Sequence, residues 1–121
     1  KIESCAYNEA TFRIPDARGY QPVHERISND APLGACVQTT LCVERLIERL
    51  QDFPVQPSTD PGRYVCNYLY YKSLCSAALQ GKGAVSVFVH VPLVFSLEDH
   101  FCFLRCLIRH IPQCMTVTHT N

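Results

Sequence analysis

The stretch GRYVCNYLYY, residues 62–71, joins a glycine-containing turn to an aromatic-rich run with helical character. It places Cys66 at the start of a predicted helix over residues 66–80, which Gly81 and Gly83 close. Unpaired N–H groups and the positive end of the helix dipole favour a thiolate at this position, and the same N–H groups can hold a developing oxyanion. The segment therefore predicts a nucleophile in the first turn of a helix.

The segment after this helix supplies a candidate base. The run VSVFVHVP, residues 85–92, is apolar and rich in β-branched residues, which is typical of a buried strand. It carries His90 near its carboxyl end, where open α/β sheets place their sites. A short strand at 55–58 before the helix completes a predicted βαβ unit, whose right-handed crossover would bring Cys66 and His90 to one edge of the sheet. From these features alone, a buried thiol and a core histidine remain the alternative.

Periodicity and turn residues predict the other elements, and residues 1–38 are expected to be mostly extended or looped. The predicted elements are a strand near residues 4–10, an amphipathic helix over 39–52 with Thr39 or Thr40 as its cap, a final helix marked by Leu97, Phe101, Leu104, Ile108 and Ile111, and a polar tail over 113–121. Within the central helix, we expect about two of Tyr68, Tyr70 and Tyr71 to be packing residues.

Three segments together resemble one protein family. They are IESCAYNEATFRIPD with the following GYQP, residues 2–22, then residues 62–71, and then FVHVP, residues 88–92. In this order and spacing they are similar to the glutamate, nucleophile and histidine segments of pyroglutamyl peptidase I, a family that removes N-terminal pyroglutamate. The runs NEATFR and CNYLYY look closest to its plant and other eukaryotic branch.

The resemblance implies a role for each matched residue. Cys66 would be the nucleophile, His90 the general base and then the acid, and Glu3 the carboxylate that orients the imidazole. Neighbours of the substrate or the oxyanion would be Phe12, Arg13 and Gln21. A solvated surface pair is the alternative for Glu3 and Arg13, and a core role is the alternative for Phe12. The family's chemistry implies neither a metal nor a cofactor.

The resemblance also implies an α/β fold, an open three-layer α/β/α sandwich with a mostly parallel sheet. Here we expect a partial version without the N-terminal strands: residues 1–121 would be a single, C-terminal portion of the domain that bears the catalytic residues. Missing strands would leave apolar surface uncovered, which leaves self-association open. Two residues depart from the family pattern: Pro61 stands where Ala is usual, and Leu93 where many members have a second proline.

Composition narrows the class of protein. An apolar content of 47% can build a core, and a net charge of +0 argues against nucleic acid or an acidic surface as a partner. We expect neither a signal peptide nor a membrane span, because the first apolar window is broken by Glu3, Asn8 and Glu9 and no run is long enough. The predicted location is the cytoplasm.

The chain has 8 cysteines, an even number that invites a disulfide framework. Several of them lie inside apolar helical or strand runs, so reduced and mostly buried thiols are the expectation. Cys102, Cys106, His110 and Cys114 recur every fourth residue, but the first and last would lie about 18 Å apart along one helix, too far for a single tetrahedral zinc ion. A two-ligand site stays open.

Three functions follow in order of preference. The first is a cysteine exopeptidase that hydrolyses the amide after an N-terminal 5-oxoproline through a thioacyl enzyme, with pyroglutamyl peptides as partners. The second is a truncated, non-catalytic homologue with a structural or interaction role. The third is a redox or metal-binding thiol protein.

Overall fold

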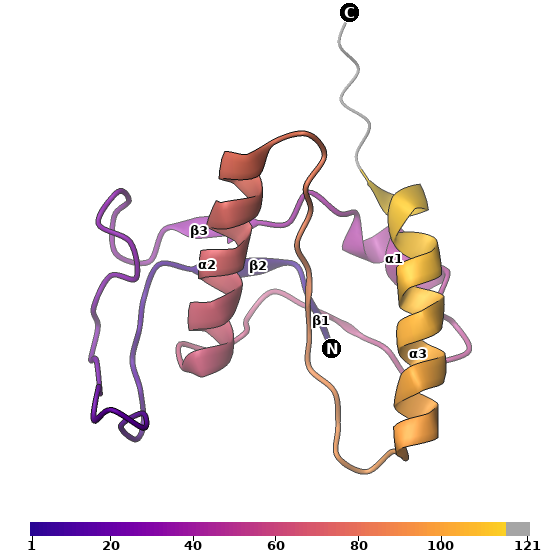
Figure 1. Cartoon of the computed structure of the whole chain (residues 1–121), viewed down its shortest axis with the longest axis horizontal. Coiled ribbons are helices and arrows are strands. Elements are labelled where there is room, and N and C mark those ends of the chain that lie inside the picture. Colours follow the sequence, from indigo (N-terminus) through magenta and orange to yellow (C-terminus); the bar gives the residue numbers. More distant parts are fainter. Residues whose placement is uncertain (116–121) are drawn as a thin grey trace, which may run out of the picture.

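The computed structural model describes residues 1–115 and arranges them as small sheets flanked by helices (Figure 1). In chain order the elements are β1 (Ile2–Glu3), β2 (Cys5–Tyr7), β3 (Cys36–Gln38), α1 (Val43–Glu48), β4 (Pro57–Ser58), α2 (Val65–Gln80), β5 (Phe88–Val89), α3 (Leu97–His110) and the 3-10 helix η1 (Ile111–Cys114). Strands and helices alternate over much of this length, and the predicted α/β class is confirmed.

Strand β1 is the middle of a three-stranded sheet in the order β4-β1-β5, and β2 and β3 form a separate antiparallel pair. β1 runs parallel to β4 but antiparallel to β5. The predicted parallel crossover from β4 through α2 to the next strand is therefore wrong. Gly81, Lys82 and Gly83 all have positive φ, so the chain reverses directly after α2 and descends past it into β5 (Figure 1). Because β1 is parallel to β4 and antiparallel to β5, the sheet is mixed.

Two apolar clusters form the core. One lies around α2 and contains Ala6, Ala10, Phe12, Ile27, Tyr70, Tyr71 and Leu74. The other joins the start of β1 to α1 and α3 and contains Ile2, Val43, Leu46, Leu50, Phe103, Leu107 and Cys114. The expectation for the tyrosines of α2 is confirmed, since two of the three are buried. β1 contributes Ile2 to the second cluster and is followed directly by β2, which contributes Ala6 to the first, so β1 lies between the two clusters.

The helices follow their predicted positions with informative differences. α2 begins one residue before Cys66, and α3 begins after Ser96, which forms a capping box with Asp99. α1 is shorter than predicted and neither predicted residue caps it: its N-cap is Cys42, while the Thr39 hydroxyl donates instead to Ser86 O. The predicted strand over 84–91 is reduced to the two residues of β5.

The predicted polar tail is wrong at its beginning. Gln113 and Cys114 belong to η1, which contains Pro112, and the Cys114 side chain is fully buried in the second cluster. The backbone carbonyl of Cys114 accepts a hydrogen bond from Cys42 N at 2.8 Å. This bond connects η1 to the residue directly before α1. The rest of the predicted tail, residues 116–121, lies outside the described residues.

All eight cysteines are free, but the expectation that most are buried is wrong. Two are buried, Cys5 and Cys114, and the others are half-buried or exposed. Within residues 1–115, no three histidine, cysteine or acidic side chains gather closely enough to hold a metal ion. In the same part of the chain, no helix has the length and apolar character that crossing a bilayer would require.

Candidate active site

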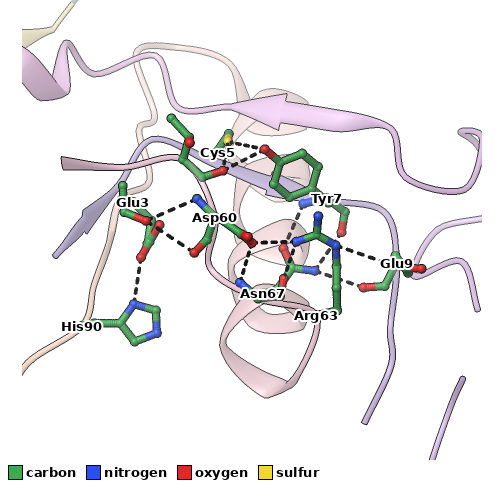
Figure 2. A network of polar contacts seen from close by, with 11 residues as sticks. Glu3, Cys5, Tyr7, Glu9, Asp60, Arg63, Asn67 and His90 are labelled. Carbon is green, nitrogen blue, oxygen red and sulfur yellow. Dashed lines mark hydrogen bonds and ion pairs between the residues drawn. The ribbon is translucent and has the colours of Figure 1, made fainter. Parts of the chain in front are cut away.

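A buried carboxylate meets an imidazole across the β1–β5 pair. Glu3 lies opposite Phe88 in the sheet, and the chain continues into His90, whose backbone N–H donates to Lys1 O at 2.8 Å. Glu3 Oε1 lies 3.0 Å from His90 Nδ1, as Figure 2 shows. The Glu3 side chain is 1% exposed and that of His90 is 39% exposed. The Glu3 carboxylate is thus buried inside the protein, whereas the His90 imidazole is partly open to solvent.

This geometry fixes which ring nitrogen is available for chemistry. A carboxylate only accepts hydrogen bonds, so Nδ1 of His90 is the donor toward Glu3 and Nε2 is left to take a proton. The second carboxylate oxygen, Oε2, is buried without a hydrogen-bond partner among residues 1–115. Buried groups of this kind are uncommon in scaffolds that only need stability and are frequent at functional sites.

Cys66 occupies the second position of α2 and is half-buried. No side chain caps the helix at its N-cap Tyr64, and the first turn carries no acidic residue. The N–H groups of this turn are therefore free of side-chain competition for an anion. Within the described part of the chain, no hydrogen bond joins Cys66 to His90. Their direct contact stays a prediction.

The side of α2 that carries Cys66 faces the β1–β5 pair. Tyr70 lies one turn after Cys66, and residues four apart share a helix face. The hydroxyl of Tyr70 donates to Glu3 O at 2.8 Å, and its ring lies 5.7 Å from that of Phe88. Phe88 in turn lies 4.9 Å from the His90 ring. Burial raises the pKa of Tyr70 to about 12, so its hydroxyl stays a donor at neutral pH.

Asn67, next to Cys66, fastens the first turn of α2 to the strand region that follows Glu3. Its side chain is fully buried. Asn67 Oδ1 accepts from Tyr7 N at 2.9 Å, and Nδ2 donates to Tyr7 O at 2.9 Å and to Glu9 O at 3.0 Å. All these contacts are drawn in Figure 2 around α2. Asn67 and Tyr70 thereby fix the position of α2 relative to β1 and β2.

The turn before α2 has its own internal order. Gly62 adopts φ 80, a region that glycine tolerates, and its N–H donates to Asp60 Oδ1 at 3.0 Å. Arg63 Nη1 donates to the same oxygen at 2.9 Å. The Gly62 N–H and then the Arg63 guanidinium lower the pKa of Asp60 below its ordinary value. Pro61, the departure from the family pattern, is buried inside this turn.

A charged chain ties the same turn to the loop after β2. Arg63 Nε lies 3.1 Å from Glu9 Oε2, and Glu9 Oε1 lies 2.7 Å from Nδ1 of His24. The Arg63 guanidinium also stacks over the Tyr7 ring at 4.1 Å from its centroid. Figure 2 shows Arg63 between Asp60, Tyr7 and Glu9. These contacts hold the turn before α2 against β2 and the loop that follows it.

The other residues predicted from the family gather beside Tyr64, the N-cap of α2. Phe12 is buried, with its ring 5.0 Å from that of Tyr64, and Arg13 is exposed, with its guanidinium 5.6 Å from the same ring. Gln21 Nε2 donates to Arg13 O at 3.1 Å and to Phe12 O at 3.4 Å. Gln21 therefore braces the loop that presents Arg13 near the start of the helix.

An open cavity of about 310 Å³ lies on the other side of His90. Its walls are mainly apolar and come from the segment before β4, the chain after β5, and α3. They include Phe53, Val55, Val91, Phe95 and Phe103, with Asp52 and Asp99 among the polar residues. The imidazole thus borders a space large enough for a side chain of a bound peptide.

The groups present are those that cysteine-nucleophile chemistry requires. A thiol at an uncapped helix start could serve as nucleophile, an imidazole with a free Nε2 as base, and the buried carboxylate behind it as orienting group. Sequence reasoning missed the positioning roles of Asn67 and Tyr70. The only local signal was a polar Asn immediately after Cys66, whereas its partners lie far away in the sequence.

Comparison with known proteins gives the same family as the residue pattern. The family model described as pyroglutamyl peptidase matches residues 1–99. Over 93 residues the chain is 39% identical to the pyrrolidone-carboxylate peptidase of Thermococcus litoralis, covering 75% of this chain and 41% of the relative. Over 94 residues it is 35% identical to that of Bacillus subtilis, covering 76% and 43%. The sequence match covers less than half the length of these two relatives.

Solved structures agree in fold. The pyrrolidone carboxyl peptidase of Pyrococcus furiosus superposes with a TM-score of 0.82 at 27% identity, over 93% of this chain and 62% of that one. The enzyme from Thermococcus litoralis gives a TM-score of 0.80 at 26% identity, over 97% of this chain and 64% of that one. The described arrangement of helices and strands therefore recurs in solved relatives, and more than a third of each relative lies outside the matched part.

Proposed function

Because this chain belongs to the pyroglutamyl peptidase family, we propose that it carries the catalytic groups of a cysteine exopeptidase that removes an N-terminal pyroglutamyl residue. The observation that carries the proposal is the Glu3–His90 contact, a fully buried carboxylate 3.0 Å from an imidazole, beside the helix face that bears Cys66. Peptides with an N-terminal 5-oxoproline are the proposed substrates.

In the proposed reaction, His90 Nε2 takes the proton of the Cys66 thiol, and the thiolate attacks the pyroglutamyl carbonyl carbon. The bond between that carbon and the peptide nitrogen then breaks, and the imidazolium gives its proton to the leaving amine. Water, deprotonated by His90, hydrolyses the thioester and releases pyroglutamate and the free thiol. Glu3 keeps the imidazole oriented and stabilises its cationic form in both halves of the reaction.

The tetrahedral intermediates need stabilisation of a negatively charged oxygen. The free N–H groups of the first turn of α2 are the proposed donors, because no side chain caps them. Arg13, held beside Tyr64, would add positive field at the same end of the helix. Phe12 would pack against Tyr64 at this end of the helix, and Gln21 would hold the Arg13 loop in place through its hydrogen bond to Arg13 O. The cavity beside His90 would receive the peptide beyond the scissile bond.

The cytoplasm is the proposed location, supported by eight free cysteines, which suit a reducing compartment. A non-catalytic homologue is the second candidate. It is favoured by Pro61 in the turn before Cys66. Proline removes a backbone N–H and fixes φ, so it can shift the entrance of the helix.

Thiol labelling of the 121-residue chain tests the proposal without requiring substrate. At neutral pH, iodoacetamide should modify Cys66 before Cys36 and Cys102, which are more exposed, and His90→Ala should slow that step at Cys66 alone. Peptide mass spectrometry reads each site separately. Labelling that simply follows exposure would contradict the proposed activation.

Hydrolysis of pyroglutamyl-aminomethylcoumarin tests the function itself. We expect a chain extended by the preceding part of the Thermococcus litoralis relative to release the fluorophore, and Cys66→Ser to abolish release nearly completely. Glu3→Gln should reduce the rate less, because the carboxylate orients and does not attack. A folded extended chain with a reactive Cys66 but no turnover would favour the non-catalytic homologue, and Pro61→Ala would be the first change to make.

A further inference from the structure

Two cysteines lie diagonally across the antiparallel pair of β2 and β3. Cys5 is opposite Gln38 and Tyr7 is opposite Cys36, so these four side chains share one face of the pair. Cys5 and Cys36 are diagonal neighbours on that face. A disulfide requires Cα atoms within about 7 Å of each other, and the right-handed twist of two strands shortens one diagonal of each face toward that distance.

The two thiols act on each other, which identifies the shortened diagonal as theirs. Burial, then a hydrogen bond with the Cys5 thiol, then the charge of Cys5 raise the pKa of Cys36 above its ordinary value, whereas the Arg63 guanidinium lowers it. Arg63 lies over the Tyr7 ring, 4.1 Å from its centroid. A cation thus lies beside the thiol pair and can stabilise a thiolate formed there.

The two cysteines differ in exposure. Cys36 is exposed to solvent, whereas Cys5 is only 4% exposed. A small oxidant therefore reaches Cys36 first, and Cys5 is in position to resolve the product from inside the protein. Because the pKa of Cys36 is raised, its reaction is slow at neutral pH. Such a thiol pair follows the steady ratio of thiol to disulfide around the protein and does not respond to a brief pulse of oxidant.

The hydrogen bonds around Cys5 allow its thiol to lose the hydrogen. The Cys5 thiol donates to Thr59 O at 3.2 Å and to Tyr7 OH at 3.5 Å. The Tyr7 hydroxyl donates to the same Thr59 O at 2.7 Å, and Figure 2 shows it next to Cys5. Thr59 O therefore keeps a donor after oxidation of Cys5, and the turn before α2 stays attached to β2.

We propose that Cys5 and Cys36 form a reversible disulfide that links β2 to β3 when a small-molecule disulfide such as oxidised glutathione is in excess. The Cys36 thiolate attacks one sulfur of that disulfide, which gives a mixed disulfide and releases one thiolate. Cys5 then attacks the Cys36 sulfur, and a second thiolate leaves. The protons of both cysteines pass to the two released thiolates. Two thiols are oxidised and one disulfide is reduced, and excess thiol reverses the exchange.

The disulfide would close the base of a long loop. The chain leaves the sheet after β2 and returns to it at β3, so residues 8–35 lie between the two linked strands. Linking the strands restricts the unfolded chain, which stabilises the folded one. The loop carries Phe12, Arg13 and Gln21. Any effect of the disulfide on catalysis therefore rests on the proposed function, whereas its formation does not.

Equilibration of the 121-residue chain in glutathione buffers, followed by acid quenching and mass spectrometry, tests the site. The linked chain lacks two hydrogens and carries no glutathione at either residue, and its Cys5 and Cys36 peptides stay joined until they are reduced. Cys102, which is also exposed, serves as the reference thiol and should form only a mixed disulfide. At one total glutathione concentration, the link should be half formed at a ratio of reduced to oxidised glutathione at least about tenfold higher than half modification of Cys102 requires.

Variants at the two exposed cysteines complete the test. Cys36→Ser should abolish the link and leave Cys5 as an unmodified thiol, whereas Cys102→Ser is the matched control and should keep the link. The linked chain should unfold at a higher urea concentration than the reduced chain. Glutathione on Cys36 with Cys5 still a free thiol overturns the proposal. An equal yield of the link in concentrated urea also overturns it, because the fold would then not direct the pairing. Neither readout involves Cys66, so the proposed function stands or fails separately.

Discussion

The two apolar clusters of this chain are held in different ways. Around α2, buried polar side chains run through the cluster: Asn8 and Asn67 are fully buried, and each bonds several backbone groups. The cluster between α1 and α3 contains only apolar residues and one cysteine. Hydrogen bonds are directional, whereas apolar packing is tolerant of small shifts. The half of the molecule that carries Cys66 is thus held by directional hydrogen bonds, and the other half is held mainly by apolar packing.

The largest expected effect is at Asn8. Its Oδ1 accepts from Ile27 N and Ser28 N, and its Nδ2 donates to three backbone carbonyls. Asn8→Ala strands these buried groups and should lower the free energy of unfolding by about 3–5 kcal/mol in urea titrations. The exposed Asn29 is the matched control, and Asn29→Ala should stay within about 0.5 kcal/mol. A loss below that of Leu46→Ala would remove the contrast between the clusters.

In the apolar cluster, Leu46→Ala should cost about 2–4 kcal/mol, because Leu46 is fully buried and its removal leaves a cavity. Leu79→Ala on the exposed side of α2 is the control and should change stability by less than about 0.5 kcal/mol. The rate at which iodoacetamide modifies Cys66 in the folded variants tests the same contrast. Leu46→Ala should leave that rate nearly unchanged, since Leu46 packs between α1 and α3, whereas Cys66 lies on α2, whose Tyr70 and Tyr71 pack in the other cluster; a changed rate would show that the halves are coupled.

Tyr70→Phe removes the hydroxyl that donates to Glu3 O and should cost about 1–2 kcal/mol at pH 8. The pKa of Tyr70 is raised from 10.0 to about 12, so above pH 10 the unfolded chain loses this proton while the folded chain keeps it. Stability contributed by the neutral hydroxyl is complete below pH 10 and is lost toward pH 12. The gap between the native chain and Tyr70→Phe should therefore shrink by about 1 kcal/mol between pH 8 and pH 11. A constant gap would contradict burial as the cause.

The smallest expected effect is at the start of α3. Ser96→Ala removes the side chain that accepts from Asp99 N and should lower stability by about 1 kcal/mol. Ser96→Asp keeps an acceptor and should restore most of the loss. The measurement is again urea unfolding, and equal losses for both substitutions would show that the capping box does not stabilise α3.

Local patterns in the sequence predicted the helices well. α2 follows from the glycine-containing turn before it and the glycines after Gln80, and α3 follows from the apolar spacing of residues 97–111, signals that act within a few residues. The capping box at Ser96 was not predicted. The sheet was less predictable. β5 has only two residues, and the turn before it includes Lys82 at φ 55, a backbone conformation that lysine rarely adopts and that the sequence does not predict.

The candidate site shows the same difference between features set by local sequence and features set by long-range contacts. Cys66 at a helix start follows from local sequence, and the pairing of Glu3 with His90 follows from the family resemblance. The contacts of Asn67 and Tyr70 join residues about sixty positions apart, so only the folded chain reveals them. Sequence patterns therefore indicated the proposed reactive groups, and the structure shows the contacts that hold their elements in place.

The side-chain amide of Asn67 imitates a peptide bond. It accepts from Tyr7 N and donates to Tyr7 O, the two groups that a neighbouring strand would otherwise engage on that side of β2. An open strand edge is a template for pairing with other chains, and natural proteins cover such edges to remain dispersed. Asn67, the residue beside the proposed nucleophile, therefore covers this edge of β2 and blocks pairing with strands of other chains. The contacts that hold the first turn of α2 in place thereby also protect the chain against aggregation.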